Sequence, residues 1–156
     1  MRLIKEDNMY FDLVDRLKQH LDSDPIVNTT SKGDIFKIDL SKNSIFPICH
    51  ILVNNVTLEG QVTRYSVSII AMDLVDFSKT EGDAYEGNNN EAYVLNTQLQ
   101  VLSRLSEMLR RGELMADGFH LDGNPTCEPF TDRFENVVAG WTLSCDILTF
   151  NDMTIC

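Results

Sequence analysis

The residues best suited to chemistry lie between Cys127 and Cys145, in the stretch CEPFTDRFENVVAGWTLSC. Asp132, Arg133 and Glu135 stand close together there, ahead of an alternating apolar segment. The stretch could be a catalytic loop that leads into a strand, a metal or redox site, or a packed loop that fixes how one subunit meets the next. An Asp–Arg–Glu group before a strand is typical of an ion-pair clamp, because the planar guanidinium binds a carboxylate through two hydrogen bonds.

The aromatic residues of the same stretch favour the packed loop. Phe130 and Phe134 lie four residues apart and would cover one apolar side, and Trp141 is the only tryptophan of the chain. Aromatic and arginine side chains are enriched in interface hot spots. We therefore predict an anchored surface loop whose subunit-interface candidates are Phe130, Asp132, Arg133, Phe134, Glu135 and Trp141.

No motif of an enzyme or of a cofactor site occurs in the sequence. The chain has no G-x-S-x-G, H-E-x-x-H, G-x-x-x-x-G-K or G-x-G-x-x-G. Its four cysteines form no C-x-x-C pair, which argues against structural zinc and favours buried free thiols. His50 falls inside a predicted strand and is interpreted as a satisfied strand histidine. We expect no enzyme, cofactor or metal.

Length and charge restrict the protein class. A chain of 156 residues fits one domain, 1–156, and no stretch has the length and apolarity of a membrane span or a secretory signal. The protein is expected to be made in the cytoplasm. Its net charge is −11, and residues 46–156 carry 16 acidic against 6 basic side chains. Phosphate binding needs clustered Lys and Arg, so direct nucleic-acid binding is not expected.

The most polar segment is residues 78–91, with the sequence SKTEGDAYEGNNNE. It carries Glu81, Asp83 and Glu86 but lacks the ligand rhythm of an EF-hand calcium loop. We predict an exposed acidic loop.

The remaining pattern predicts an α+β domain. Apolar residues at helical spacing indicate an N-terminal helix over residues 7–21 and a long helix over 91–111. Residues 26–45 read as an extended connection that holds an edge strand near 35–40. Alternation predicts strands over 46–55, 61–77 and 141–150, with a hairpin connection over 56–60 and a short strand over 119–121. We expect an antiparallel sheet with both helices packed on it.

Four sequence segments, taken in their order along the chain, resemble the tail-terminator and neck (head–tail connector) ring proteins of tailed bacteriophages. They are YFDLVDRLKQHL, IFPICHILVNNVTLEGQVTRYSVSIIAMDLVDFSK, GNNNEAYVLNTQLQVLSRLSEMLRRG and CEPFTDRFENVVAGWTLSCDILTF. The resemblance covers roughly residues 8–150 and rests on order, size and phrasing.

The resemblance implies a structural virion protein that assembles in the host cytoplasm. Such subunits form a ring, commonly a hexamer, that caps the head-proximal end of the tail tube, ends tube polymerisation and docks to the head connector. DNA passes through the acidic lumen without specific binding, and the family offers no catalytic residues to carry over.

Three other interpretations stay open. The chain could be another tail or neck ring component, such as a tube or connector protein. It could be a monomeric module that presents the acidic segment 78–91 to a basic partner. It could also be a small enzyme that uses the stretch from Cys127 to Cys145.

Overall fold

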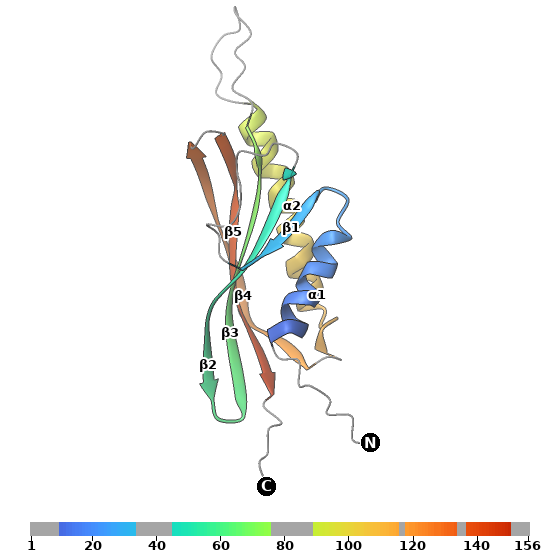
Figure 1. Ribbon diagram of the computed structural model, residues 1–156, viewed down its shortest axis with the longest axis vertical. Coiled ribbons are helices and arrows are strands. Elements are labelled where there is room, and N and C mark those ends of the chain that lie inside the picture. The colour runs from blue at the N-terminus through green and yellow to red at the C-terminus, as the bar shows by residue number, and fades with distance from the viewer. Residues whose placement is uncertain (1–9, 34–44, 76–88, 116–117, 134–136, 151–156) are drawn as a thin grey trace, which may run out of the picture.

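The computed structural model describes residues 10–33, 45–75, 89–115, 118–133 and 137–150, with only the backbone for 89, 90, 132, 133 and 137. Seven elements make up this part of the chain (Figure 1). They are α1 (Tyr10–Asp22), β1 (Thr29–Lys32), β2 (Ile48–Glu59), β3 (Val62–Leu74), α2 (Asn89–Arg110), β4 (Phe119–Arg133) and β5 (Val137–Phe150).

The five strands form one sheet in the order β1-β2-β3-β5-β4. β2, β3, β5 and β4 run antiparallel to their neighbours, as expected, whereas β1 lies parallel to β2. The sheet is therefore mixed, and the prediction of a purely antiparallel sheet is wrong at this edge. Thr29 to Lys32 of β1 pair in the same order with Ile48 to Ile51 of β2, so both strands begin at the same end of the sheet. The α+β class is confirmed.

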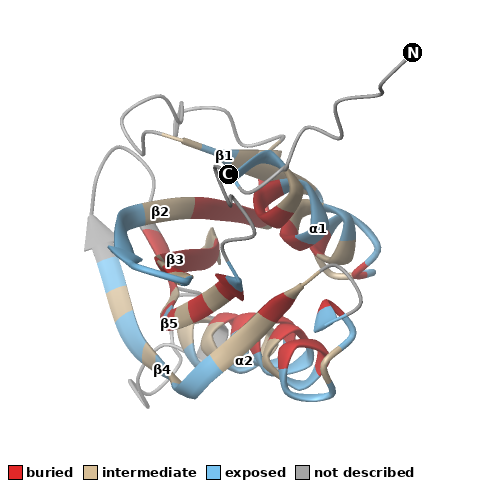
Figure 2. Cartoon of the chain, turned by 90° about the horizontal axis from the view of Figure 1, so that it is seen from below, coloured by how far each residue is buried: buried red, intermediate tan, exposed pale blue. Residues whose placement is uncertain are grey.

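Both helices pack on the same face of the sheet, which we call the inner face (Figure 2). Tyr65, Val67, Ile69 and Ala71 alternate along β3 and all point into this core, as their spacing predicts. α1 buries Leu13, Val14, Leu17 and Leu21 against it. Tyr10, the first residue of the helix, is exposed.

A second, smaller cluster covers one end of the opposite, outer face. Phe46, Ile48, Ile70, Met72 and Val138 are buried there. Continuous apolar residues near the end of β3 are thereby explained, because this part of the strand is buried on both faces.

The strands are longer than the sequence indicated. β2 continues to Glu59, and only Gly60 and Gln61 connect it to β3, so the predicted connection over 56–60 is wrong. Gly60 has a φ of 70°, a value that glycine adopts without a steric penalty. β4 spans fifteen residues where three were predicted. The edge strand predicted near 35–40 lies outside the described residues.

Candidate functional site

The stretch that holds the interface candidates forms one end of the sheet. β4 runs up to Arg133 and β5 starts back at Val137, so residues 130–133 and 137–141 lie side by side. The end of β3 at Leu74 pairs with Val138, and α2 begins beside them (Figure 1). We call this region the hairpin end and define it as residues 73–75, 91–95, 130–133 and 137–141.

A side-chain hydrogen bond joins two parts of the hairpin end that are far apart in sequence. The hydroxyl of Thr131 on β4 donates to the carboxylate of Glu91 on α2 at 2.8 Å. Glu91 closes the predicted acidic segment 78–91, and Thr131 lies within the predicted interface stretch. The two segments singled out from the sequence therefore meet at one place in the fold.

Trp141 anchors the hairpin end to the helix layer. Its indole Nε1–H donates to the backbone carbonyl of Leu95 at 2.8 Å. The ring is partly buried and packs against the main core on the inner face. Within a single chain, this interface candidate thus holds β5 to α2.

Phe130 lies on the opposite face of the sheet. Its partner across the β4–β5 pair is Gly140, so it shares the outer face with Val138 and Met72. Phe130 packs there against the smaller apolar cluster. Phe130 and Trp141 therefore lie on opposite faces and do not form one aromatic patch. Their spacing in the sequence did not reveal this separation.

The stretch is not a loop up to residue 133, as was predicted, but the second half of β4. Asp132 and Arg133 pair through their backbones with Val138 and Val137. Gly140 lies inside β5, where a Cβ atom would collide with the Ala71 carbonyl oxygen. The extra paired length comes from β5, which pairs with residues 119–122 and 126–133 of β4.

Several candidates fall outside what the structure describes. The side chains of Asp132 and Arg133 and all of Phe134 and Glu135 belong to this group. The acidic-loop candidates Glu81, Asp83 and Glu86 do as well. The Asp–Arg–Glu clamp and the exposed acidic loop therefore remain predictions, although the flanks of both segments are at the hairpin end.

Asp73 is a titratable group of the hairpin end that the sequence did not single out. It is half-buried beside Ala139 on β5, and its carboxylate accepts a 2.8 Å hydrogen bond from the Leu74 N–H. Burial raises the pKa of Asp73, and the hydrogen bond from Leu74 only partly opposes this. The sequence does contain a sign of this site, because Asp73 is a carboxylate within an otherwise apolar part of β3.

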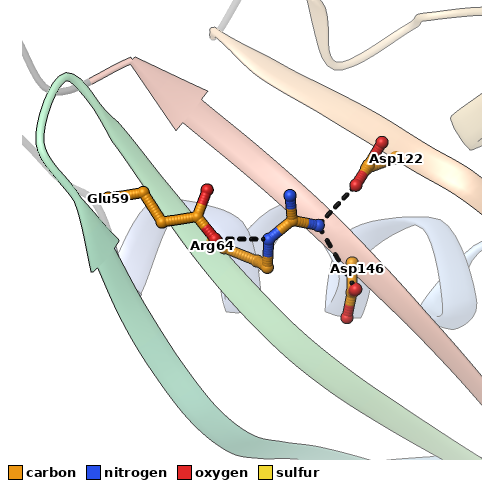
Figure 3. Close-up of polar contacts among 4 residues, drawn as sticks. All are labelled: Glu59, Arg64, Asp122 and Asp146. Carbon is orange, nitrogen blue, oxygen red and sulfur yellow. Dashed lines mark hydrogen bonds and ion pairs between the residues drawn. The ribbon is translucent and has the colours of Figure 1, made fainter.

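A cluster of one arginine and three carboxylates lies at the other end of the outer face (Figure 3). Arg64 on β3 binds Glu59 on β2 at 2.9 Å, Asp146 on β5 at 3.3 Å, and Asp122 on β4. The hydrogen bonds to Asp122 and Glu59 raise the pKa of Arg64 further above its usual range. One guanidinium thus ties four strands together, which is the clamp chemistry expected for the Asp132–Arg133–Glu135 group, at a different place.

The described surroundings of Cys49, Cys145 and His50 are those of buried residues within the fold. Cys49 and Cys145 are buried free thiols, and burial raises the pKa of each to about 12. His50 is buried between β1 and β2, with Nδ1 2.7 Å from the Ser31 hydroxyl and Nε2 2.8 Å from the Gly33 carbonyl. Because a carbonyl only accepts, Nε2 carries the proton in that contact. Within the described ranges, no three His, Cys, Asp or Glu side chains gather in a way that could hold a metal ion.

A shallow groove of about 440 Å³ lies between the ends of the two helices. Its arginines are engaged, Arg104 with Asp24 and Arg111 with Glu107. Burial lowers the pKa of His20, which also lines the groove. The groove has charges of both signs and shows no arrangement of nucleophile and base.

Comparison with known proteins gives no further assignment. No protein-family model matches the chain, and no curated protein matches it. Among the described residues, no helix has the length and apolarity needed to cross a membrane.

Proposed function

We propose that this protein is a structural component of a phage virion, a ring-forming subunit that caps the head-proximal end of a tail tube. In this role it ends tube polymerisation and docks to the head connector. The resemblance of its phrases to tail terminators and neck ring proteins is the starting point of the proposal.

One structural observation carries the proposal further. The segment 78–91 and the stretch 127–135 are separate in the sequence, yet Glu91 and Thr131, which are 40 positions apart, are hydrogen-bonded at the hairpin end. A ring subunit needs a defined end with which it can meet its neighbours. We assign that role to the hairpin end, and Asp132, Arg133, Phe134 and Glu135 stay the candidate contact residues.

The packing of Trp141 and Phe130 assigns them a supporting role in such a contact. Trp141 fixes β5 to α2, and Phe130 fixes β4 to the outer cluster. With Trp141 and Phe130 anchored in this way, the described part of the β4–β5 pair would lose little conformational entropy on binding, which favours tight association.

The charge of the chain suits a ring through which DNA passes. With a net charge of −11, the subunit would repel phosphates from its surface, so DNA would not be held in the lumen. In this proposal the acidic side chains Glu81, Asp83 and Glu86 lie toward the lumen or on an exposed rim.

The proposal is tested by imaging the purified chain alone and with tail tubes. Negative-stain images and light scattering should show rings or capped tube ends, and Phe134→Ala or Arg133→Ala should reduce them. Arg110→Ala is the matched control, because Arg110 is exposed at the far end of α2.

A strictly monomeric chain at high concentration, with no affinity for tail tubes, would contradict the proposal. Binding of such a monomer to a basic protein through segment 78–91 would instead support the acidic binding module. Incorporation along the whole length of the tube, rather than at its end, would identify a tube protein.

A further inference from the structure

Among the residues that the structure describes, β2 has an unpaired edge beyond Ile51. β1 pairs only with residues 48–51, and the last contact on this side is the Gly33 N–H donating to the Ile51 carbonyl at 3.1 Å. In the described part of the chain, no strand lies beside residues 52–59 on that side. An edge of this kind presents unpaired N–H and C=O groups to another strand.

The register identifies the residues whose backbone groups point outward. The Ile51 carbonyl points toward β1, so alternate residues share that direction. Between Val53 and Asn55 the register shifts by one residue, which moves the outward set from odd to even numbers. Beyond the shift, the backbone groups of Val56 and Leu58 therefore point to the free edge.

The opposite edge of the sheet is poorly suited to pairing. β4 contains Pro125 and Pro129, which have no N–H to donate, and its register is irregular between Asp122 and Thr126. Asp122 and Glu128 add negative charges along it. These are devices that protect an edge, and residues 52–58 of β2 have neither a proline nor a charge.

The free edge also exposes apolar side chains. Leu58 is 75% exposed and Val56 is 43% exposed, both on the inner face beyond α1. Residues 51–58 contain no ionisable side chain, although the chain as a whole has a net charge of −11. A second copy of the chain can approach this edge with the least electrostatic repulsion.

Leu58 at this edge keeps most of its surface exposed, and no described strand lies beside it on that side. Within the described residues, the edge near Leu58 is therefore open to a second molecule.

We propose that the free edge of β2 pairs with the same edge of a second copy, antiparallel and about a two-fold axis. The register that matches apolar side chains places Val56 opposite Leu58 of the partner subunit and Leu58 opposite the partner subunit's Val56. Thr57 then lies on the axis, opposite the partner subunit's Thr57. Opposed residues share a face, so the exposed Val and Leu side chains cover one another.

Such a contact closes after two copies, because the same edge is used on both sides. It describes the free subunit and involves none of the residues assigned to ring contacts at the hairpin end. The two proposals can therefore fail independently of each other.

Cysteine cross-linking tests the pairing and its register. With glutathione disulfide as oxidant, Thr57→Cys should form a disulfide-linked dimer, because position 57 faces itself in a closely spaced pair. Asn55→Cys is the matched control: position 55 is also exposed and on the same face but would lie opposite the partner subunit's Glu59. The wild-type chain, treated in the same way, measures any background cross-linking through the native cysteines.

Sedimentation velocity gives a second measurement. A short strand pair associates weakly, so the wild-type dimer should appear between about 10 µM and about 1 mM. Leu58→Pro removes an outward N–H and should abolish the dimer, while leaving the β2–β3 ladder intact. Leu58→Lys keeps that N–H but adds a charge to the edge, and this variant should also abolish the dimer.

Circular dichroism would show that both variants fold. Equal cross-linking at positions 55 and 57, no cross-linking at 57, or a dimer that persists in both folded Leu58 variants would overturn the proposal.

Discussion

Arg104 on α2 binds the buried carboxylate of Asp24, just after α1, with both oxygens engaged. Nε lies 2.7 Å from Oδ2 and a terminal nitrogen lies 2.9 Å from Oδ1. Burial alone would raise the pKa of Asp24, but Arg104 and the Ile26 N–H outweigh it and lower that pKa. This pair of residues, 80 positions apart, joins the ends of the two helices.

Replacing Arg104 should destabilise the protein strongly. Arg104→Ala leaves the Asp24 carboxylate buried without its cation, which we expect to cost about 2–3 kcal/mol, less than for a fully buried pair because Arg104 is partly exposed. Arg104→Lys should cost less, since it keeps the charge but not the two-point geometry. Urea unfolding measures both, with Arg110→Ala as an exposed control expected within about 0.5 kcal/mol.

Acid should weaken the fold through Asp24. A carboxylate whose pKa is lowered in the folded state contributes stability above its unfolded pKa of about 3.8. That contribution is lost as the pH falls from there through the folded pKa. Unfolding free energies at about pH 5 and about pH 2 should differ less in Asp24→Asn than in the wild type; an unchanged difference would exclude this role.

Asp73 should act in the opposite direction. Its pKa is raised in the folded state, so stability falls as the pH rises from the unfolded pKa through the folded one. Asp73→Asn keeps an oxygen for the Leu74 N–H but removes the charge. The variant should be more stable than the wild type at neutral pH, in thermal unfolding, and the gain should shrink in acid.

Gly140 should tolerate no side chain. A Cβ there would collide with the Ala71 carbonyl oxygen and lie 2.8 Å from the Met72 Cα, both backbone atoms of the neighbouring strand. Gly140→Ala should cost about 3 kcal/mol or more, because a central strand must move. Gly123→Ala meets no atom within 4 Å but has a φ of 72°, so it should cost only about 1–2 kcal/mol. Equal losses for the two variants would contradict the close approach of β3 and β5.

Gln98 should be a site where an apolar residue stabilises the fold. The side chain on α2 is fully buried, and neither amide atom has a hydrogen-bond partner among the described residues. Gln98→Leu should raise the free energy of unfolding by about 1 kcal/mol or more, because a desolvated amide is removed at similar volume. Gln100→Leu, exposed on the same helix, should change it by no more than about 0.5 kcal/mol. A loss of stability in Gln98→Leu would indicate that the amide is satisfied.

The sequence by itself determined the local features of this protein. Regular apolar spacing sets the inner face of β3, from Tyr65 to Ala71, and the two helices, because each pattern is read within a few neighbouring residues. His50 lies within a strand and is hydrogen-bonded as expected, and Cys49 and Cys145 are buried as expected, whereas Cys127 is only partly buried.

Only the tertiary structure decided which distant residues meet. The length of β4 could not be predicted from its polar sequence, because the strand is held by hydrogen bonds to β5 and has no alternating apolar pattern of its own. The parallel course of β1, the pairing of Arg104 with Asp24, and the placement of Phe130 and Trp141 on opposite faces are likewise long-range. Each of these contacts depends on strand order and register, which local side-chain preferences do not encode.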